Sequence, residues 1–426
     1  MHWPFAIGNW PLWIGTGEGL AWWDWAFFDA FVESKFITLF SVLFGASFAL
    51  QLERTQLPSG EFRAIYLRRL AILALFGIAH GLLLYSAEVL LAYAVIGLML
   101  FGLHRLPGDL LLRAGLALLG VSVVWAYVSG YVELNSASLG IVAVAALAVG
   151  LATFLPLTVT LSIAVGVTVI AAIAVLNLPG HEGPNVAEEF RAAQWLRGAM
   201  RSNDISAWPT EFRVRKLGSF ADLFRLHTTQ YRMVLEYIAL VLVWRTLALF
   251  LIGAALIRSG LLERLSQSDW ARVALIGLGI GVPLSCLATG ATALELHTGL
   301  VLQWPLFVHA LSSLPLAAGI AAGVHLLHRR HEASFFWRMT QAAGRMALTN
   351  YLGQSAVMAL LAESWGLGWY AQLSGPALTL LAILVWAALA LASFIWLRYW
   401  RMGPLEWLWR CGTYWRLLPN RVAGHR

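Results

Sequence analysis

Two ionisable side chains, His80 and Glu88, interrupt an almost entirely apolar stretch, FGIAHGLLLYSAEVLLAYAVIG at residues 76–97. An ionisable group at bilayer depth costs about 2.5–3.5 kcal/mol on insertion scales, so such a group marks a functional site by default. If the two side chains meet across a turn between helices, the carboxylate raises the basicity of the imidazole and fixes its tautomer, as a general base requires. The structural alternative is a buried hydrogen-bonded pair that only holds the turn.

Three further polar side chains lie in apolar runs where a substrate could bind. Lys35 needs a buried anion or a watery cavity, because an ammonium group is costly inside a membrane. Asn350 and Gln354 lie one helical turn apart and suit a substrate hydroxyl, although interhelical hydrogen bonds explain them equally well. We therefore predict a substrate-binding role for Lys35, Asn350 and Gln354, with packing as the alternative.

Arginines near the ends of two apolar runs form a candidate site for phosphate groups. Arg68, Arg69 and Arg345 are expected to set the membrane topology, and guanidinium groups also match phosphate oxygens. Glu406 is expected to pair with an arginine of a loop. The sequence has no P-loop, no HExxH motif and no His/Cys/Asp cluster with metal-ligand spacing, so we predict neither ATP hydrolysis nor a metal site.

The composition identifies the elements that must position these residues. The 426 residues are 60% hydrophobic and 12% charged, and the mean hydropathy is +0.72. Apolar runs of about 20 residues recur along the chain, which is typical of a polytopic helical membrane protein. The net charge of +7 is explained by cytoplasmic arginines, so we expect membrane lipids and no nucleic acid as partners. Cys286 and Cys411 lie in different parts of this topology and predict no disulfide.

The sequence predicts an all-α transmembrane bundle of about 10–11 spans, each near the length that crosses a core of ~30 Å. The expected spans are 27–52, 64–86, 88–104, 109–129, 138–155, 157–177, 234–258, 271–292, 303–327, 345–365 and 376–399. Arginines occur in alternate short connections, which places those connections in the cytoplasm: Arg54, Arg63, Arg68, Arg69, Arg105, Arg113, Arg258, Arg264, Arg272, Arg329, Arg330, Arg338 and Arg345.

Four regions follow from this topology. They are an N-terminal transmembrane bundle (1–177), an extracytoplasmic amphipathic connection (178–232), a C-terminal transmembrane bundle (233–400) and a cytoplasmic tail (401–426). Within the connection, apolar and aromatic side chains recur at helical spacing and predict an amphipathic helix: Phe220, Leu223, Phe224, His227 and Tyr231. Gly277 and Gly281 are spaced for close contact between two helices.

Four blocks of sequence resemble the YeiB-like family of bacterial inner-membrane proteins, which is described as a domain of unknown function. The blocks are KFITLFSVLFGASFALQLER (35–54), YLRRLAILALFGIAHGLLLYSAEVLLAYAVIGLML (66–100), GRMALTNYLGQS (344–355) and GPLEWLWRCGTYW (403–415). The resemblance implies a multi-pass protein of the bacterial cytoplasmic membrane. Members of the family usually begin with a helix that carries an LRG-like motif. Here the start, MHWPFAIG, resembles only the end of that helix, and we expect the missing part to be encoded upstream.

The family is distantly similar to transmembrane acyltransferases, and this similarity implies a function. An acyl group would pass from a CoA thioester, bound at Arg68, Arg69 and Arg345, to an envelope glycan, a lipid or a small molecule. His80, oriented by Glu88, would act as the general base. His2 falls close to the position of a catalytic histidine in related acyltransferases. Two alternatives remain: a transporter or flippase that uses His80 and Glu88 as a proton relay, and a non-catalytic membrane scaffold.

Overall fold

The structure is a computed structural model that describes residues 20–54, 59–103, 106–128, 210–298, 304–370, 372–373 and 375–422. Every named element in these ranges is helical, and their one β-bridge joins Trp400 to Arg421. The predicted all-α fold class is therefore confirmed. The predictions for His2, for the spans 138–155 and 157–177 and for the first part of the connection lie outside the described residues.

The helices of the N-terminal part follow the predicted spans, with one exception. The elements are α2 (Leu20–Phe31), α3 (Lys35–Arg54), α4 (Ser59–Leu83), α5 (Leu90–Gly102) and α6 (Gly108–Val128). The exception is the predicted span 27–52, which corresponds to the candidate membrane span Trp22–Glu53 but is divided into the separate helices α2 and α3. Ser34 adopts the left-handed conformation, with φ at 60°, and the helix cannot continue through that residue.

The C-terminal part begins with two helices that come before the first predicted span of that bundle. Its elements are α10 (Thr210–Leu217), α11 (Phe220–Tyr237), the π-helix η2 (Ile238–Leu242), α12 (Val243–Arg258), α13 (Leu261–Arg264), α14 (Gln267–Thr298), α15 (Pro305–His331), α16 (Phe335–Arg345), α17 (Ala347–Ala362), α18 (Gly375–Tyr399) and α19 (Pro404–Tyr414). Helix α11 confirms the predicted amphipathic helix and buries Leu223, His227 and Tyr231. The boundary proposed at 232/233 falls inside α11, which runs through η2 into α12.

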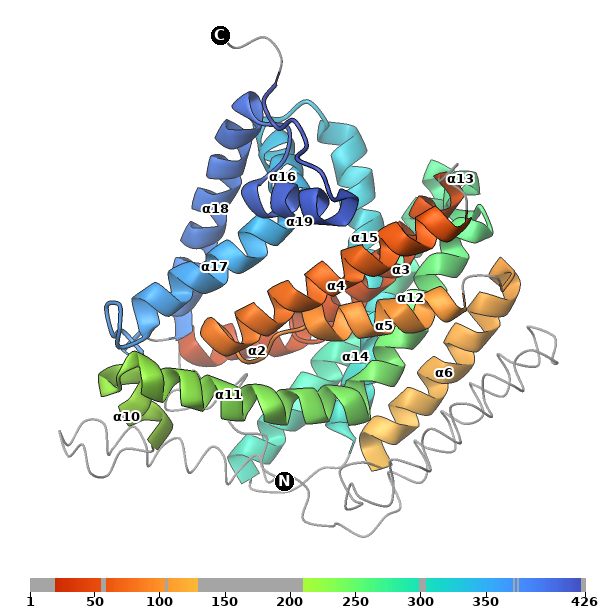
Figure 1. The fold of residues 1–426 in the computed structure, drawn as a ribbon. Helices are drawn as coiled ribbons and strands as arrows, with labels where there is room; N and C mark the ends of the chain where they lie inside the picture. The colour runs from red at the N-terminus through yellow and green to blue at the C-terminus, as the bar shows by residue number, and fades with distance from the viewer. Residues whose placement is uncertain are drawn as a thin grey trace.

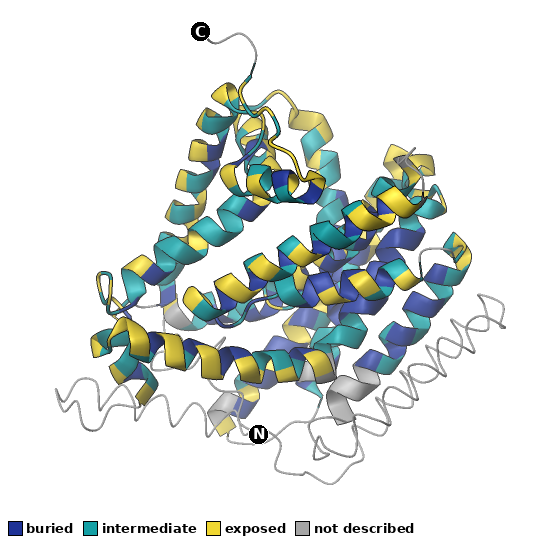
Figure 2. Ribbon diagram, viewed as in Figure 1, coloured by how far each residue is buried: buried dark blue, intermediate teal, exposed yellow. Residues whose placement is uncertain are grey.

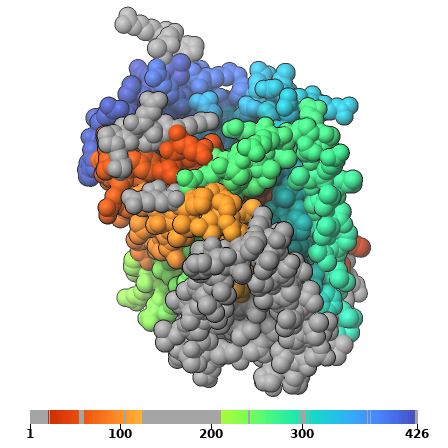
Figure 3. Space-filling view, turned by 90° about the vertical axis from the view of Figure 1, so that its right-hand side faces the viewer, coloured from red at the N-terminus to blue at the C-terminus, as the bar shows by residue number. Residues whose placement is uncertain are grey.

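Helix α12 occupies the middle of the bundle and contacts α3, α5 and α6 (Figure 1). Its approach to α3 is as close as two backbones allow. A Cβ atom at Gly253 would lie 1.9 Å from the carbonyl oxygen of Val42, and one at Gly45 would lie 2.0 Å from that of Phe250. In the view from the side, helices of the N-terminal part (orange) and of the middle of the chain (green) pack together, with the C-terminal helices (blue) above them (Figure 3).

The buried and exposed apolar residues separate as expected for a helical protein in lipid. The core contains residues of α3, α4, α5, α6 and α12, including Phe48, Tyr66, Leu100 and Phe250, and dark blue residues are seen on these helices in Figure 2. Large apolar side chains are exposed on the outer helices, among them Leu275, which is 75% exposed on α14. Such surfaces are unfavourable in water and are satisfied by lipid chains.

Five helical segments within the described residues are long and apolar enough to cross a membrane. They are Trp22–Glu53, which contains the break between α2 and α3, and Gly60–Leu83, Gln267–Glu295, Phe307–His331 and Gly375–Tyr399. Helix α5 is apolar but shorter. Together with the exposed apolar faces, these segments identify a helical membrane protein. The orientation relative to the cytoplasm stays a prediction.

Helices α14 and α15 pack against each other through glycines, as predicted for Gly277 and Gly281. A Cβ atom at Gly277 would lie 2.6 Å from the carbonyl oxygen of Pro315 and 2.7 Å from the backbone nitrogen of Gly319. One at Gly281 would lie 2.6 Å from Leu316. The close approach fixes the position of α15 and therefore of His309, which α15 carries.

Gly277→Leu should lower the melting temperature of the detergent-purified protein, because the new side chain meets backbone atoms that cannot move aside. Overpacking of this kind costs about 1–3 kcal/mol. Gly279→Leu is the matched control, since no atom lies within 4 Å of a Cβ at Gly279. Equal melting temperatures for the two variants would contradict the close contact between α14 and α15.

Candidate functional site

The break between α2 and α3 places Lys35 at the first position of α3, inside the bundle. Its side chain is only 1% exposed. The Nζ atom donates to the backbone carbonyl oxygen of Asp29, at 2.9 Å, and lies 3.3 Å from Nδ1 of His309. Lys35 was expected to meet a buried anion or a watery cavity, and its two direct contacts are instead a carbonyl oxygen of α2 and the imidazole of α15.

Asp29 and His309 form a carboxylate–imidazole pair beside this lysine. Nε2 of His309 lies 2.9 Å from Oδ2 of Asp29, and the hydroxyl of Thr289 donates to the same oxygen at 2.6 Å. A lysine ammonium can only donate, so its contact with Nδ1 leaves the proton of a neutral imidazole on Nε2, the ring nitrogen that lies nearer the carboxylate. Among the described residues Nε2 makes no aligned hydrogen bond, so its contact with Asp29 is one of charge and distance. Lys35, His309, Asp29 and Thr289 thus form one chain of polar contacts that joins α2, α3, α14 and α15.

Arg245 lies one helical turn further along the contact between α3 and α15, beside the same helix break. It follows η2, and π-helical segments are frequent at functional sites. The guanidinium donates to the hydroxyl of Thr38, in the first turn of α3, at 3.1 Å and to the hydroxyl of Ser313 at 2.5 Å. Arg245 therefore links the centre of the bundle to both α3 and α15.

The structure does not join His80 to Glu88, which corrects the predicted hydrogen-bonded pair. His80 is 1% exposed, and neither of its ring nitrogens has a hydrogen-bond partner in the described part of the chain. Its ring lies 5.0 Å from that of Tyr351. Both oxygens of Glu88 instead accept from backbone N–H groups in the first turn of α5, those of Leu90 and Leu91. The turn makes Glu88 a helix cap, and the catalytic role of either residue stays a prediction.

The three arginines of the predicted CoA site lie around α19 and do not converge on one point. Arg69 donates to Gln51 and stacks on the ring of Trp409, with 4.5 Å from its guanidinium carbon to the ring centroid. Arg345 donates to the carbonyl oxygen of Arg401, just before α19. Arg68 donates within its own helix. Their binding of a CoA phosphate stays a prediction.

The two predicted substrate-binding residues of α17 lie apart from the Lys35 site. Asn350 donates to Ser393 of α18, at 2.9 Å, and to the carbonyl oxygen of Ala343, which is the packing role left open from the sequence. Gln354 is exposed. Glu406 was expected to pair with an arginine, but it accepts from the backbone and hydroxyl of Thr349 and so caps α17.

A second polar network, which the sequence analysis did not identify, joins α10 and α11 to the residues that follow α17. Arg215 donates to Glu211 at 2.9 Å, to Gln230 at 2.9 Å and to Glu363. Gln230 also accepts from Ser86 in the turn before α5. The side chains of Arg215 and Glu363 are 12% and 4% exposed, so this is a buried ion pair.

The electrostatic environment keeps Arg215 charged. Burial lowers its pKa, but Tyr370, Glu363 and Glu211 outweigh this effect and raise the pKa above the ordinary value. His227 lies 3.6 Å from Glu363 and 3.4 Å from Arg215. The network therefore holds α10 and α11 against the ends of α4 and α17, next to His80.

Three site residues that the sequence analysis did not select could have been found from their residue type and position. Asp29, Arg245 and His309 all fall inside predicted spans, where an ionisable side chain indicates function in the same way as Lys35. Arg215 and Glu363 lie outside or at the edge of the spans, where charged residues are common. Only the folded chain shows that these two are buried.

Arg215→Gln should lower the melting temperature strongly, because it leaves two carboxylates without their cation. Removing one partner of a buried ion pair costs about 3–5 kcal/mol. Arg232→Gln on α11 is the control. Arg232 and its partner Glu236 have side chains that are 82% and 57% exposed, and such a pair contributes about 0–1 kcal/mol. Similar melting temperatures for both variants would show that the network does not hold α10 in place.

Comparisons with known proteins agree with the resemblance predicted from the sequence. Residues 256–416 match the family described as "Protein of unknown function (DUF418)". The chain is 27% identical to "Uncharacterized protein YeiB" of Escherichia coli (strain K12), over 94% of this chain and 87% of the relative. It is 26% identical to "Uncharacterized protein YxaH" of Bacillus subtilis (strain 168), over 90% and 80% of the two chains.

The match to a third relative is local. The chain is 31% identical to "Uncharacterized 39.9 kDa protein in amylase 3'region" of Bacillus acidopullulyticus, over 28% of this chain and 34% of the relative. No solved structure matches the chain. The C-terminal part of the chain is thus similar to the DUF418 family, and nearly the whole chain is similar to YeiB, as the four sequence blocks predict.

Proposed function

We propose that this membrane protein is an acyltransferase that moves an acyl group from a CoA thioester to a hydroxyl or amine of an envelope glycan, a lipid or a small molecule. The observation that carries the proposal is the distance of 2.9 Å between Nε2 of His309 and Oδ2 of Asp29. A histidine oriented by a buried carboxylate is the arrangement that general-base catalysis needs. The geometry supports His309 in the role that the sequence suggested for His80.

The contacts of His309 define how the transfer would proceed. With the proton of the neutral ring on Nε2, 2.9 Å from Asp29, Nδ1 can accept a proton once the acceptor group takes the place of Lys35. The acceptor oxygen or nitrogen then forms a bond to the thioester carbonyl carbon as its proton passes to Nδ1. The carbon–sulfur bond breaks, and the proton moves from His309 to the departing CoA sulfur. Lys35 stabilises the negative charge that develops on the carbonyl oxygen.

The donor would bind on the cytoplasmic side, near α19. Arg69 and Arg345 flank this helix through their contacts with Trp409 and Arg401. Arginine forks suit the phosphate groups of CoA. The relatives from Escherichia coli and Bacillus subtilis support a location in the bacterial cytoplasmic membrane.

Proton-coupled transport is the second candidate, and a specific observation favours it. The polar chain of Lys35, His309 and Asp29 crosses a break between two helices within one candidate span. Broken helices and buried ionisable chains are typical of transporters. The same residues would then pass protons rather than activate an acceptor.

His309→Ala should lower the rate of acyl transfer by about 100-fold or more, because general-base catalysis contributes about 10²–10⁴-fold. Asp29→Asn should also lower the rate, since an amide loses the charge that stabilises the protonated ring. The measurement is release of free CoA by the detergent-purified protein with an acyl-CoA and a panel of hydroxyl and amine acceptors. His80→Ala is the comparison variant and should retain most of the rate.

If His80→Ala abolishes acyl transfer and His309→Ala does not, the general base is His80, as predicted from the sequence. Transfer that persists in both histidine variants would rule out a histidine base at either position. Transport is favoured over acyl transfer if the protein releases no CoA but acidifies the lumen of proteoliposomes, and if His309→Ala abolishes this acidification.

A further inference from the structure

Two basic side chains inside the bundle, Lys35 and Arg245, have only neutral hydrogen-bond acceptors. Arg245 donates to the hydroxyls of Thr38 and Ser313. Lys35 contacts the carbonyl oxygen of Asp29 and the ring of His309. Among the residues that the structure describes, no carboxylate lies within ion-pair distance of either cation, since Asp29 directs its carboxylate to His309 and Thr289.

The surroundings of the two cations add further positive potential. Both lie at the first turn of α3, where the N–H groups of an α-helix lack intrahelical acceptors and the helix dipole is positive. Helix N-termini of this kind bind phosphate groups and other anions. The guanidinium of Arg245, the ammonium of Lys35 and the start of α3 all contribute positive potential. Asp29 and Glu33 act on Lys35 as negative charges, whereas both acceptors of Arg245 are neutral hydroxyls, and a buried cation without a paired anion is unfavourable.

We propose that Lys35 and Arg245, with the hydroxyls of Thr38 and Ser313, bind the phosphate group of an anionic ligand. Guanidinium groups form two parallel hydrogen bonds with phosphate oxygens, and hydroxyl groups can donate to the remaining ones. The bound phosphate supplies a paired negative charge to Arg245, whose two described acceptors are neutral hydroxyls. The site shares Lys35 with the proposed acyl transfer, but phosphate binding requires no acyl donor and is therefore tested separately.

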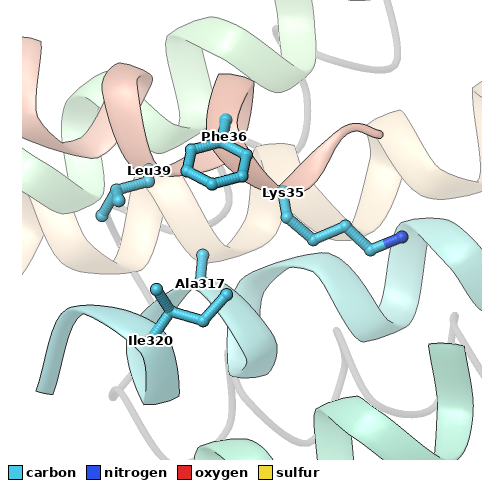
Figure 4. A pocket seen from close by; sticks show the side chains of 5 residues that line it. All are labelled: Lys35, Phe36, Leu39, Ala317 and Ile320. Carbon is cyan, nitrogen blue, oxygen red and sulfur yellow. The ribbon is translucent and has the colours of Figure 1, made fainter. Parts of the chain in front are cut away.

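The phosphate can belong to a lipid or to a soluble molecule. An apolar slot between α3 and α15 lies along the stem of Lys35 and is lined by Phe36, Leu39, Ala317 and Ile320 (Figure 4). Phe36 is 44% exposed on the outer face of α3. These apolar side chains give an acyl chain a surface to lie against beside the cations, which makes phosphatidylglycerol the lipid probe. Glycerol 3-phosphate is the soluble probe with the same phosphate ester.

The test measures binding of both probes to the full-length protein in a neutral detergent, through the rise in melting temperature and the derived Kd. We expect at least one probe to bind the wild-type protein. Arg245→Gln and Lys35→Gln should weaken that binding about tenfold or more, because each removes a charge-assisted hydrogen bond. Arg225→Gln is the control, because the side chain of Arg225 is 82% exposed on α11.

Ser313→Ala keeps the charges of Lys35 and Arg245, so it replaces the two charge variants in the test if these fail to fold. It should weaken probe binding by a smaller factor than Arg245→Gln or Lys35→Gln. Binding of the lipid alone, or of the soluble ester alone, supports the site and identifies the source of the phosphate. The proposal is overturned if neither probe binds the wild-type protein. It is also overturned if Arg245→Gln and the control Arg225→Gln bind the probe equally strongly. Failure of CoA release does not affect this result, since no acyl donor is present.

Discussion

The need to satisfy charged groups inside an apolar bundle is the constraint on which the rest of this structure depends. Lys35, Asp29 and His309 are costly at bilayer depth unless each finds a polar partner. In one continuous helix, Asp29 and Lys35 would point to different sides, because residues six positions apart are not neighbours on a helix surface. The break at Ser34 lets Nζ of Lys35 reach back to the carbonyl of Asp29. The same break exposes the start of α3 to Arg245.

Close helix contacts position these groups. Gly45 and Gly253 let α3 and α12 approach until their backbones touch, and this approach brings Arg245 to Thr38. The glycines of α14 and α15 do the same for the helices that carry Thr289 and His309. A polar site of this kind cannot move without separating backbones in close contact. Small residues in the bundle therefore provide the rigidity that precise acid–base geometry needs.

Hydrophobicity predicted the helices well because each span needs a long apolar run, and that signal is local in sequence. The described helices α4, α6, α14, α15 and α18 coincide with predicted spans apart from shifts at their ends. The helix break was missed because apolar residues flank Ser34 on both sides at the length of one span. The polar residues Asp29, Glu33 and Lys35 were not taken as the end of a helix.

Pairings between side chains were harder to predict. Glu88 and Glu406 each cap a helix, a use of a carboxylate that depends on where the helix begins. Lys35 was identified correctly as a residue that needs a polar partner, but the partner comes from α15, far away in the sequence. Helix periodicity does not report which helices are neighbours. The Asp29–His309 pair could have been suspected from the residue types, whereas their contact could not.

The protonation state of His309 tests the central claim most directly. Nitrogen-15 NMR of histidine-labelled protein in lipid bilayers distinguishes the two neutral tautomers, and the signal of His309 is the one that disappears in His309→Gln. The arrangement of Asp29 and Lys35 predicts a neutral ring with its proton on Nε2, and Asp29→Asn should change this signal. A ring with its proton on Nδ1, or a signal that Asp29→Asn leaves unchanged, would contradict the carboxylate-oriented base.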